Sequence, residues 1–131
     1  MLLALLTAAL LDPRPLYEPS MTAGQMYDGC ARYVASTSPP DPGDEGAAEC
    51  ALAAAALLAE NAAQAPINDT DSDTRAFCLP ETLIKGADVA AMRTFITYVD
   101  RNPASRSADA SAVLNRALVE KWPCPRQAGD G

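Results

Sequence analysis

Apolar residues recur along this chain at intervals of three and four positions, which is the spacing of one face of an α-helix. The stretches with this pattern are separated by clusters of proline, a residue that interrupts helices. We therefore predict four helices, at roughly 22–35, at 50–63, within 83–101 and within 107–122. Strands are disfavoured because Val and Ile total only eight and no run alternates apolar and polar residues over several positions. The expected fold class is all-α, a small bundle of four main helices.

Three of these helices carry one apolar stripe, and the second helix is apolar nearly all round. We predict that the helix at 50–63 is central and buried, because apolar residues on every side are typical of a buried helix. Asp44 and Ser107 are expected as N-caps of the second and fourth helices, and Asn102-Pro103 as the end of the third. The predicted stripes are Met26, Cys30, Tyr33 and Val34; Ile84, Ala87, Ala91, Phe95, Tyr98 and Val99; and Ala110, Val113, Leu114, Ala117, Leu118 and Trp122.

The core that these helices can build is small. Of the 131 residues 27 are alanine, and only 24 are Leu, Ile, Val or Phe. Small domains bury a small fraction of their surface and often need further stabilisation. The four cysteines, Cys30, Cys50, Cys78 and Cys124, form no CxxC pair. An even number in a short exported chain predicts two disulfides, worth roughly 3–4 kcal/mol each. The alternative is four buried, reduced thiols in a cytoplasmic protein.

The layout of the helices also predicts how the cysteines pair. Short connections favour antiparallel neighbouring helices. The end of the first helix then lies near the start of the second, which brings Cys30 close to Cys50. The end of the fourth helix returns near the start of the third, which brings Cys124 beside Cys78. We therefore predict the disulfides Cys30–Cys50 and Cys78–Cys124.

The N-terminal segment is apolar and is followed by prolines. Residues 2–11 read LLALLTAALL, which is too short for the ~20 residues of a membrane span and is typical of the centre of a secretory signal peptide. No Lys or Arg precedes the run, so either the start of the signal peptide is truncated or the segment is a buried helix. We divide the chain into a signal remnant with a proline-rich lead at 1–20, a helical domain at 21–124 and a disordered tail at 125–131.

The charge and the missing residue types exclude several functions. Lys and Arg total 10 and Asp and Glu total 17, and the resulting net charge of -7 disfavours binding to nucleic acid. The sequence has no histidine, which excludes Ser-His-Asp triads, Cys-His dyads and histidine-ligated zinc. No P-loop, GxSxG or GxGxxG motif occurs. We expect no catalysis and no cofactor.

The acidic segment 69–73, DTDSD, resembles the start of a calcium-binding loop, in which oxygens at alternate positions converge on the ion. The sixth position of such a loop is glycine and the twelfth is a bidentate glutamate, but here they are Thr74 and Pro80. We therefore expect no metal and predict a solvated acidic loop that offers a negatively charged contact surface.

A more specific pattern covers residues 77–124. Phe77-Cys78-Leu79-Pro80-Glu81 is followed by Gly86, Tyr98, Asn102-Pro103, Val113-Leu114, Ala117-Leu118 and Trp122-Pro123-Cys124. This pattern resembles the C-terminal half of the Rap/Tai family of immunity proteins, in which a CLPEG-type segment opens one helix and a second helix ends in an aromatic-Pro-Cys. The segment 24–30, GQMYDGC, is similar to the first helix of that family. The chain departs from the family at Ala51-Leu52, where Gly-Tyr is usual, and at Thr82, where Gly is common.

The resemblance implies a periplasmic helical protein, often a homodimer, that binds and blocks a type VI secreted peptidoglycan amidase without catalysis. The family offers no contact motif that can be transferred, so we infer contacts from loop position and charge. An alternative is a periplasmic stress protein like the small acid chaperones, with no toxin partner, because those proteins are also small, helical and disulfide-linked. The predicted partner-binding residues are Asp69, Asp71 and Asp73 of the acidic segment and Arg101 and Arg106 near the turn between the third and fourth helices.

Overall fold

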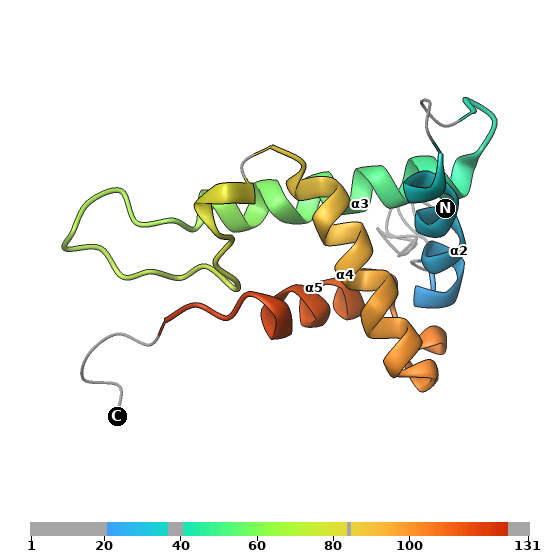
Figure 1. Cartoon of the computed structure of the whole chain (residues 1–131). Helices are drawn as coiled ribbons and strands as arrows, with labels where there is room; N and C mark the ends of the chain where they lie inside the picture. Colours follow the sequence, from blue (N-terminus) through green and yellow to red (C-terminus); the bar gives the residue numbers. More distant parts are fainter. Residues whose placement is uncertain (1–20, 37–40, 84, 126–131) are drawn as a thin grey trace, which may run out of the picture.

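The computed structural model describes residues 21–36, 41–83 and 85–125, and within these ranges the chain is a bundle of four α-helices (Figure 1). The described ranges contain no strand, and two disulfides cross-link the bundle. The predicted all-α class and four-helix architecture are confirmed. The elements are α2 (Ala23–Ala35), α3 (Glu45–Ala63), η1 (Glu81–Leu83), α4 (Ala87–Arg101), η2 (Pro103–Ser107) and α5 (Ala110–Lys121), where η denotes a 3₁₀ turn.

Side-chain caps determine where the first two of these helices begin. Thr22 accepts a hydrogen bond from the backbone N–H of Gln25, and the Gln25 side chain accepts one from the N–H of Thr22. This reciprocal pair is a capping box, which satisfies two N–H groups that the helix itself leaves unpaired. Asp44 accepts from the N–H of Ala47 at 3.0 Å and caps α3, as predicted.

The boundary between α4 and α5 differs from the prediction in one respect. Helix α4 ends at Arg101, so the predicted stop at Asn102-Pro103 is correct. The predicted N-cap Ser107 is wrong, because η2 extends from Pro103 to Ser107 and α5 begins only at residue 110. Asp109 caps α5 by accepting from the N–H of Ala112 at 3.0 Å. A 3₁₀ turn after the proline thus shifts the start of the helix along the chain.

The hydrophobic core lies among α2, α4 and α5 and is closed by the segment before η1. The predicted stripes of these three helices line it, with Tyr33, Val34, Ala87 and Trp122 only partly buried. Ile84, assigned to the stripe at 83–101, lies outside the described residues. The largest fully buried side chains are Phe77, Phe95, Met26, Met92, Leu114 and Leu118.

Helix α2 is held closely against both α3 and the start of α5. A Cβ at Gly29 would lie 2.1 Å from the carbonyl oxygen of Gly46. The backbones of α2 and α3 can therefore come this close only because position 29 is a glycine. At its other end, the N–H of Ala23 donates to the carbonyl of Ala108 at 2.8 Å, and the N–H of Ala110 donates to Met21 at 2.9 Å. These contacts join the beginnings of α2 and α5.

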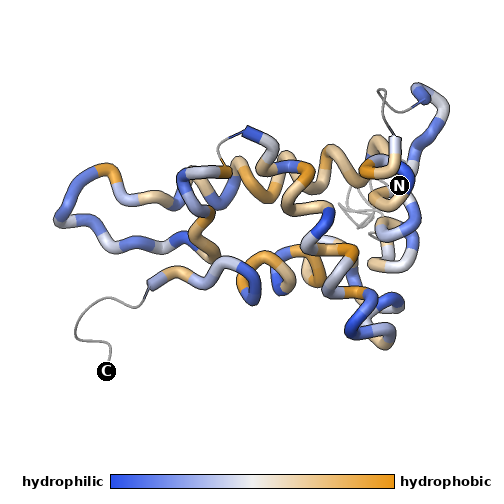
Figure 2. Tube along the Cα trace, viewed as in Figure 1, coloured by the Kyte–Doolittle hydropathy of each residue, from blue (hydrophilic) through white to orange (hydrophobic). Residues whose placement is uncertain are grey.

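The prediction that the second helix is central and buried is wrong. Helix α3 lies along one edge of the bundle (Figure 1), and only Ala47, Cys50, Ala54 and Asn61 are buried in it. Leu52 is 64% exposed, and alanines fill much of the outer surface. Figure 2 shows hydrophobic colours along most of this helix. The physical reason is that alanine is small enough to be exposed at little cost, so an alanine-rich pattern does not determine burial.

Several predictions concern residues outside the described ranges. The signal remnant and proline-rich lead at 1–20 and residues 126–131 of the predicted tail lie there, as do residues 37–40 of the proline-rich connection. Among the described helices, none combines the length and the apolar character needed to cross a bilayer.

Candidate partner-binding surfaces

The two disulfides join the cysteines in the pairs that the helix layout predicts. Cys30 and Cys50 lie fully buried between α2 and α3, with Cα atoms 5.3 Å apart. Cys78 and Cys124 are half-buried, with Cα atoms 4.8 Å apart, and join the segment before η1 to the end of α5. All four sulfurs are therefore engaged.

The second disulfide also excludes one group of residues as a metal site. The ligand atoms of Asp73, Cys78 and Cys124 lie within 4.8 Å of one another. Metals bind thiolates, however, and both of these sulfurs are joined in a disulfide. The Asp73 carboxylate is also paired with Arg75 at 2.7 Å. The cluster therefore offers no set of free ligands.

The most prominent surface feature is the acidic loop, residues 65–76, between α3 and the second disulfide. It projects away from the bundle in Figure 1 and is mostly hydrophilic in Figure 2. The carboxylates of Asp69 and Asp71 are exposed on it. Ile67 is 94% exposed and lies two positions before the first of these acids. The loop thus presents an apolar side chain near negative charge, a combination that the acidic pattern of the sequence does not indicate.

Side chains within the acidic loop fold its tip. The carboxylate of Asp71 accepts from the N–H groups of Ile67 and Asn68, at 3.1 and 3.2 Å. The Asn68 side chain in turn accepts from the N–H of Thr70 at 3.0 Å. Asp71 therefore has a structural role as well as a charge. These are local turns of the kind that Asp and Asn favour.

Asp73 is engaged differently from the other two acids. Its carboxylate accepts from the Arg75 guanidinium at 2.7 and 3.0 Å and from the Arg75 backbone N–H. The side-chain hydrogen bonds from Arg75, followed by the backbone one, lower the pKa of Asp73 to about 2. Of the three predicted contact acids, Asp69 and Asp71 are thus exposed, whereas Asp73 is already neutralised by a neighbour.

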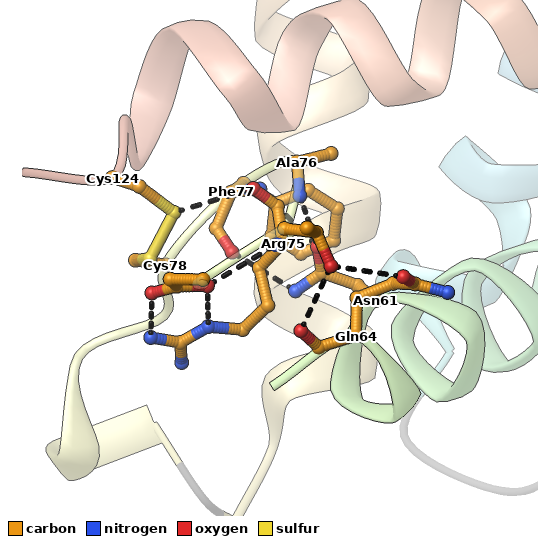
Figure 3. The surroundings of a disulfide bond; sticks show 9 residues. Asn61, Gln64, Arg75, Ala76, Phe77, Cys78 and Cys124 are labelled. Atoms are coloured by element: carbon orange, nitrogen blue, oxygen red, sulfur yellow. Dashed lines mark hydrogen bonds and ion pairs between the residues drawn. A yellow bond between two sulfur atoms is a disulfide. The ribbon is translucent and has the colours of Figure 1, made fainter. Parts of the chain in front are cut away.

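A buried amide holds the base of the acidic loop (Figure 3). The Oδ1 atom of Asn61 accepts from the N–H groups of Ala76 and Phe77, at 2.9 and 3.2 Å, and its Nδ2 donates to the Phe77 carbonyl at 2.9 Å. The Thr74 hydroxyl donates to Gln64. Asn61 was missed in the sequence, although an uncharged polar residue within a mostly apolar helix segment is a usable signal.

The predicted cationic contacts lie elsewhere and are engaged within the fold. Arg101 pairs with Glu120 of α5 at 3.0 Å. Arg106 lies 3.5 Å from the carboxylate of Asp28, and its guanidinium carbon is 4.8 Å from the ring centre of Tyr27. Both side chains remain accessible to solvent, with Arg101 61% and Arg106 44% exposed.

The structure does not bring the five predicted contact residues together. The acidic loop projects from one end of the molecule, whereas the turn with η2 lies at the other end (Figure 1). One compact contact patch cannot include both. The candidate surface for a single partner is therefore the acidic loop, and the turn that carries Arg101 and Arg106 is a separate surface.

A third surface is the outer face of α3. Leu52 is its one large exposed apolar residue. Exposed alanines occur three or four positions apart on either side of it, so they share one face of the helix. This outer α3 face consists of Ala48, Leu52, Ala55, Ala59 and Ala62.

Comparison with known proteins gives a family match. A protein-family model described as Rap1a immunity proteins matches residues 22–124. The curated proteins and the solved structures compared with the chain yield no match. The matched range begins at the N-cap of α2 and ends at the last cysteine, so it includes all four described helices and both disulfides.

Proposed function

The chain belongs to the Rap1a immunity protein family, and on this premise we propose that it binds and blocks a type VI secreted peptidoglycan amidase. The family match over residues 22–124 is the observation that carries this proposal. The matched range covers the four described helices and both disulfides of this chain. The proposed action is simple occupation of the amidase active-site cleft.

The acidic loop is the proposed inhibitory contact. Its exposed Ile67 can act as an apolar anchor, and Asp69 and Asp71 surround it with negative charge. Negative charge speeds the approach to a basic cleft and suppresses wrong partners. The hydrogen bonds of Asn61 and the Cys78–Cys124 disulfide hold the loop base in place. A preorganised loop loses less conformational entropy on binding.

Two features support action without catalysis in the periplasm. The sequence has no histidine to act as a general base, and all four cysteines are oxidised. Disulfides persist in oxidising compartments such as the periplasm, and they are rare in the cytosol. Export directed by a signal remnant within residues 1–20 is a prediction.

The outer α3 face is the proposed interface of a homodimer. Small side chains allow two helices to approach closely, and Leu52 supplies the one bulky contact. Leu52→Glu would place a charge in this interface. We expect the variant to be monomeric by analytical ultracentrifugation, with an unchanged helical signal in circular dichroism. If the variant still forms the dimer, the outer α3 face is not the dimer interface.

The proposal is tested by adding the purified chain to type VI amidases and measuring both binding and peptidoglycan hydrolysis. We expect a tight complex and loss of hydrolysis. The loop contact is tested with Ile67→Ser, because a side chain that is 94% exposed can be changed without loss of folding. Its control is Ala112→Ser, an exposed position of α5 outside the acidic loop and the outer α3 face. If Ile67→Ser inhibits as well as the wild type, the loop is not the inhibitory contact.

A further inference from the structure

A pocket opens at the base of the acidic loop, where the C-terminal half of α3 faces α5. Its volume is about 350 Å³. Leu57 and Phe77 form apolar parts of its wall, and Glu60, Thr74 and Asn115 are polar groups that line it. A smaller hollow of about 120 Å³ continues between the same two helices and shares Leu57 and Glu60 with it.

Two polar side chains that line this pocket have no partner among the described residues. Glu60 is exposed and forms no ion pair with any described residue. Asn115 is half-buried and makes no hydrogen bond within the described part of the chain. By contrast, both polar atoms of the neighbouring Asn61 amide are engaged in holding the loop base. The described residues of the lining include a carboxylate but neither lysine nor arginine.

We propose that this pocket receives a basic side chain of the partner protein, most favourably an arginine. The inference rests on the proposed function, since the partner in question is the amidase. The alkyl stem of the side chain would pack against Leu57 and Phe77, as the stems of long basic residues do on apolar surfaces. Its charged head would meet two acceptors, the carboxylate of Glu60 and the amide oxygen of Asn115.

The chemistry of the pocket disfavours other occupants. A purely apolar side chain would cover Glu60 and Asn115 without giving either a hydrogen bond, which carries a desolvation cost. An acidic side chain would be repelled by Glu60. Arginine fits better than lysine because its planar group carries five donors and can serve two acceptors together.

The pocket and the acidic loop form one continuous surface. Thr74 and Ala76, at the base of the loop, also line the pocket. The exposed charges along this surface, at Glu60, Asp69 and Asp71, have the same sign. A partner with a basic surface can therefore contact the loop and place one side chain in the pocket at the same time.

The first test measures the dissociation constant of the chain with an amidase that the wild type binds. Glu60→Gln keeps the shape of the side chain and removes its charge, and we expect binding weaker by about tenfold, in line with a lost charge-assisted hydrogen bond. Ala63→Leu narrows the pocket without a change of charge and should weaken binding as well. Glu49→Gln, on the same helix but away from the pocket, is the matched control and should stay within about twofold of the wild type.

The second test uses the full chain alone and so does not depend on the amidase. N-acetyl-arginine methylamide is titrated while amide chemical shifts are followed by NMR, with the citrulline analogue as an uncharged control of the same shape. We expect shifts confined to residues that line the pocket, such as Ala63, Thr74 and Asn115, from the arginine compound only. They should be absent in Glu60→Gln.

The two tests separate failure of the inference from failure of the proposed function. Equal shifts from both compounds, or wild-type amidase binding by both Glu60→Gln and Ala63→Leu, would overturn the assignment of the pocket. If the wild-type chain binds no amidase while the arginine compound still perturbs the pocket, the choice of partner is wrong and the basic-side-chain specificity stands.

Discussion

Replacing Asn61 by alanine should destabilise the protein and release the base of the acidic loop. The side chain makes three hydrogen bonds to backbone groups of Ala76 and Phe77, and Phe77 is fully buried. The substitution leaves the N–H and the carbonyl of Phe77 without partners. Buried groups left unsatisfied cost about 1–3 kcal/mol each. We expect a loss of about 2–4 kcal/mol of unfolding free energy, because water that enters from the adjacent pocket can satisfy part of the lost hydrogen bonding.

The assay is urea denaturation followed by circular dichroism, combined with amide hydrogen exchange at residues 76 and 77. Asn115→Ala is the matched control, because it removes the same type of side chain from a helix where that side chain has no hydrogen bond to the described residues. It should change stability by less than about 0.5 kcal/mol. If Asn61→Ala behaves like this control and the two amides exchange no faster, Asn61 does not hold the loop.

Three further predictions concern the scaffold. Cys78→Ser combined with Cys124→Ser should lower the unfolding free energy, measured by urea denaturation, by about 4 kcal/mol for a closed loop of this length. This value lies within the roughly 0–5 kcal/mol that disulfides contribute in proteins. A loss under about 1 kcal/mol would contradict a bracing role for this disulfide. Gly29→Ala should cost about 3 kcal/mol or more because its Cβ would lie 2.1 Å from a carbonyl oxygen of α3, and an unchanged melting temperature would be incompatible with this contact. The pKa of Asp44 in the folded protein is lowered to about 2, chiefly by the hydrogen bond from Arg32. The ionised Asp44 therefore stabilises the fold fully at pH values above the ordinary pKa of an aspartate in the unfolded chain, and this stabilisation is lost as the pH falls towards about 2. Asp44→Asn should flatten that part of a profile of denaturation midpoints against pH, and an identical profile would rule out this contribution.

The helices could be predicted because their signals are local. Proline clusters and capping residues mark where the chain can and cannot be helical, and Asp44 illustrates this directly. The cysteine pairing followed from the same layout, since only neighbouring helix ends bring Cys30 near Cys50. Ser107 failed as a cap because two plausible capping residues lie close together, and the 3₁₀ turn after Pro103 decides between them.

The burial of α3 could not be read from the hydrophobic pattern. Alanine contributes to an apolar count but loses little by exposure, so the position of the helix depends on where larger residues such as Phe77 and Phe95 pack. Those contacts are between elements far apart in the sequence. The same limit applies to Asn61, whose partners lie 15 and 16 positions away.

The candidate site was predicted in part. The acidic segment 69–73 is exposed as expected, except that Asp73 is paired with Arg75. The arginines could not be placed relative to it, because a charge pattern does not indicate which end of a bundle a turn occupies. Ile67 was overlooked, since one isoleucine between polar residues gives no periodic signal, and its 94% exposure appears only in the folded loop.

The most direct test of the central claim is the rate of peptidoglycan hydrolysis by a type VI amidase as the oxidised chain is added. We predict that hydrolysis stops when one protomer has been added per amidase, and that Ile67→Ser shifts the inhibition curve to higher concentration. Hydrolysis that continues unchanged at a large excess of the chain, across the amidases tested, would contradict the proposed function.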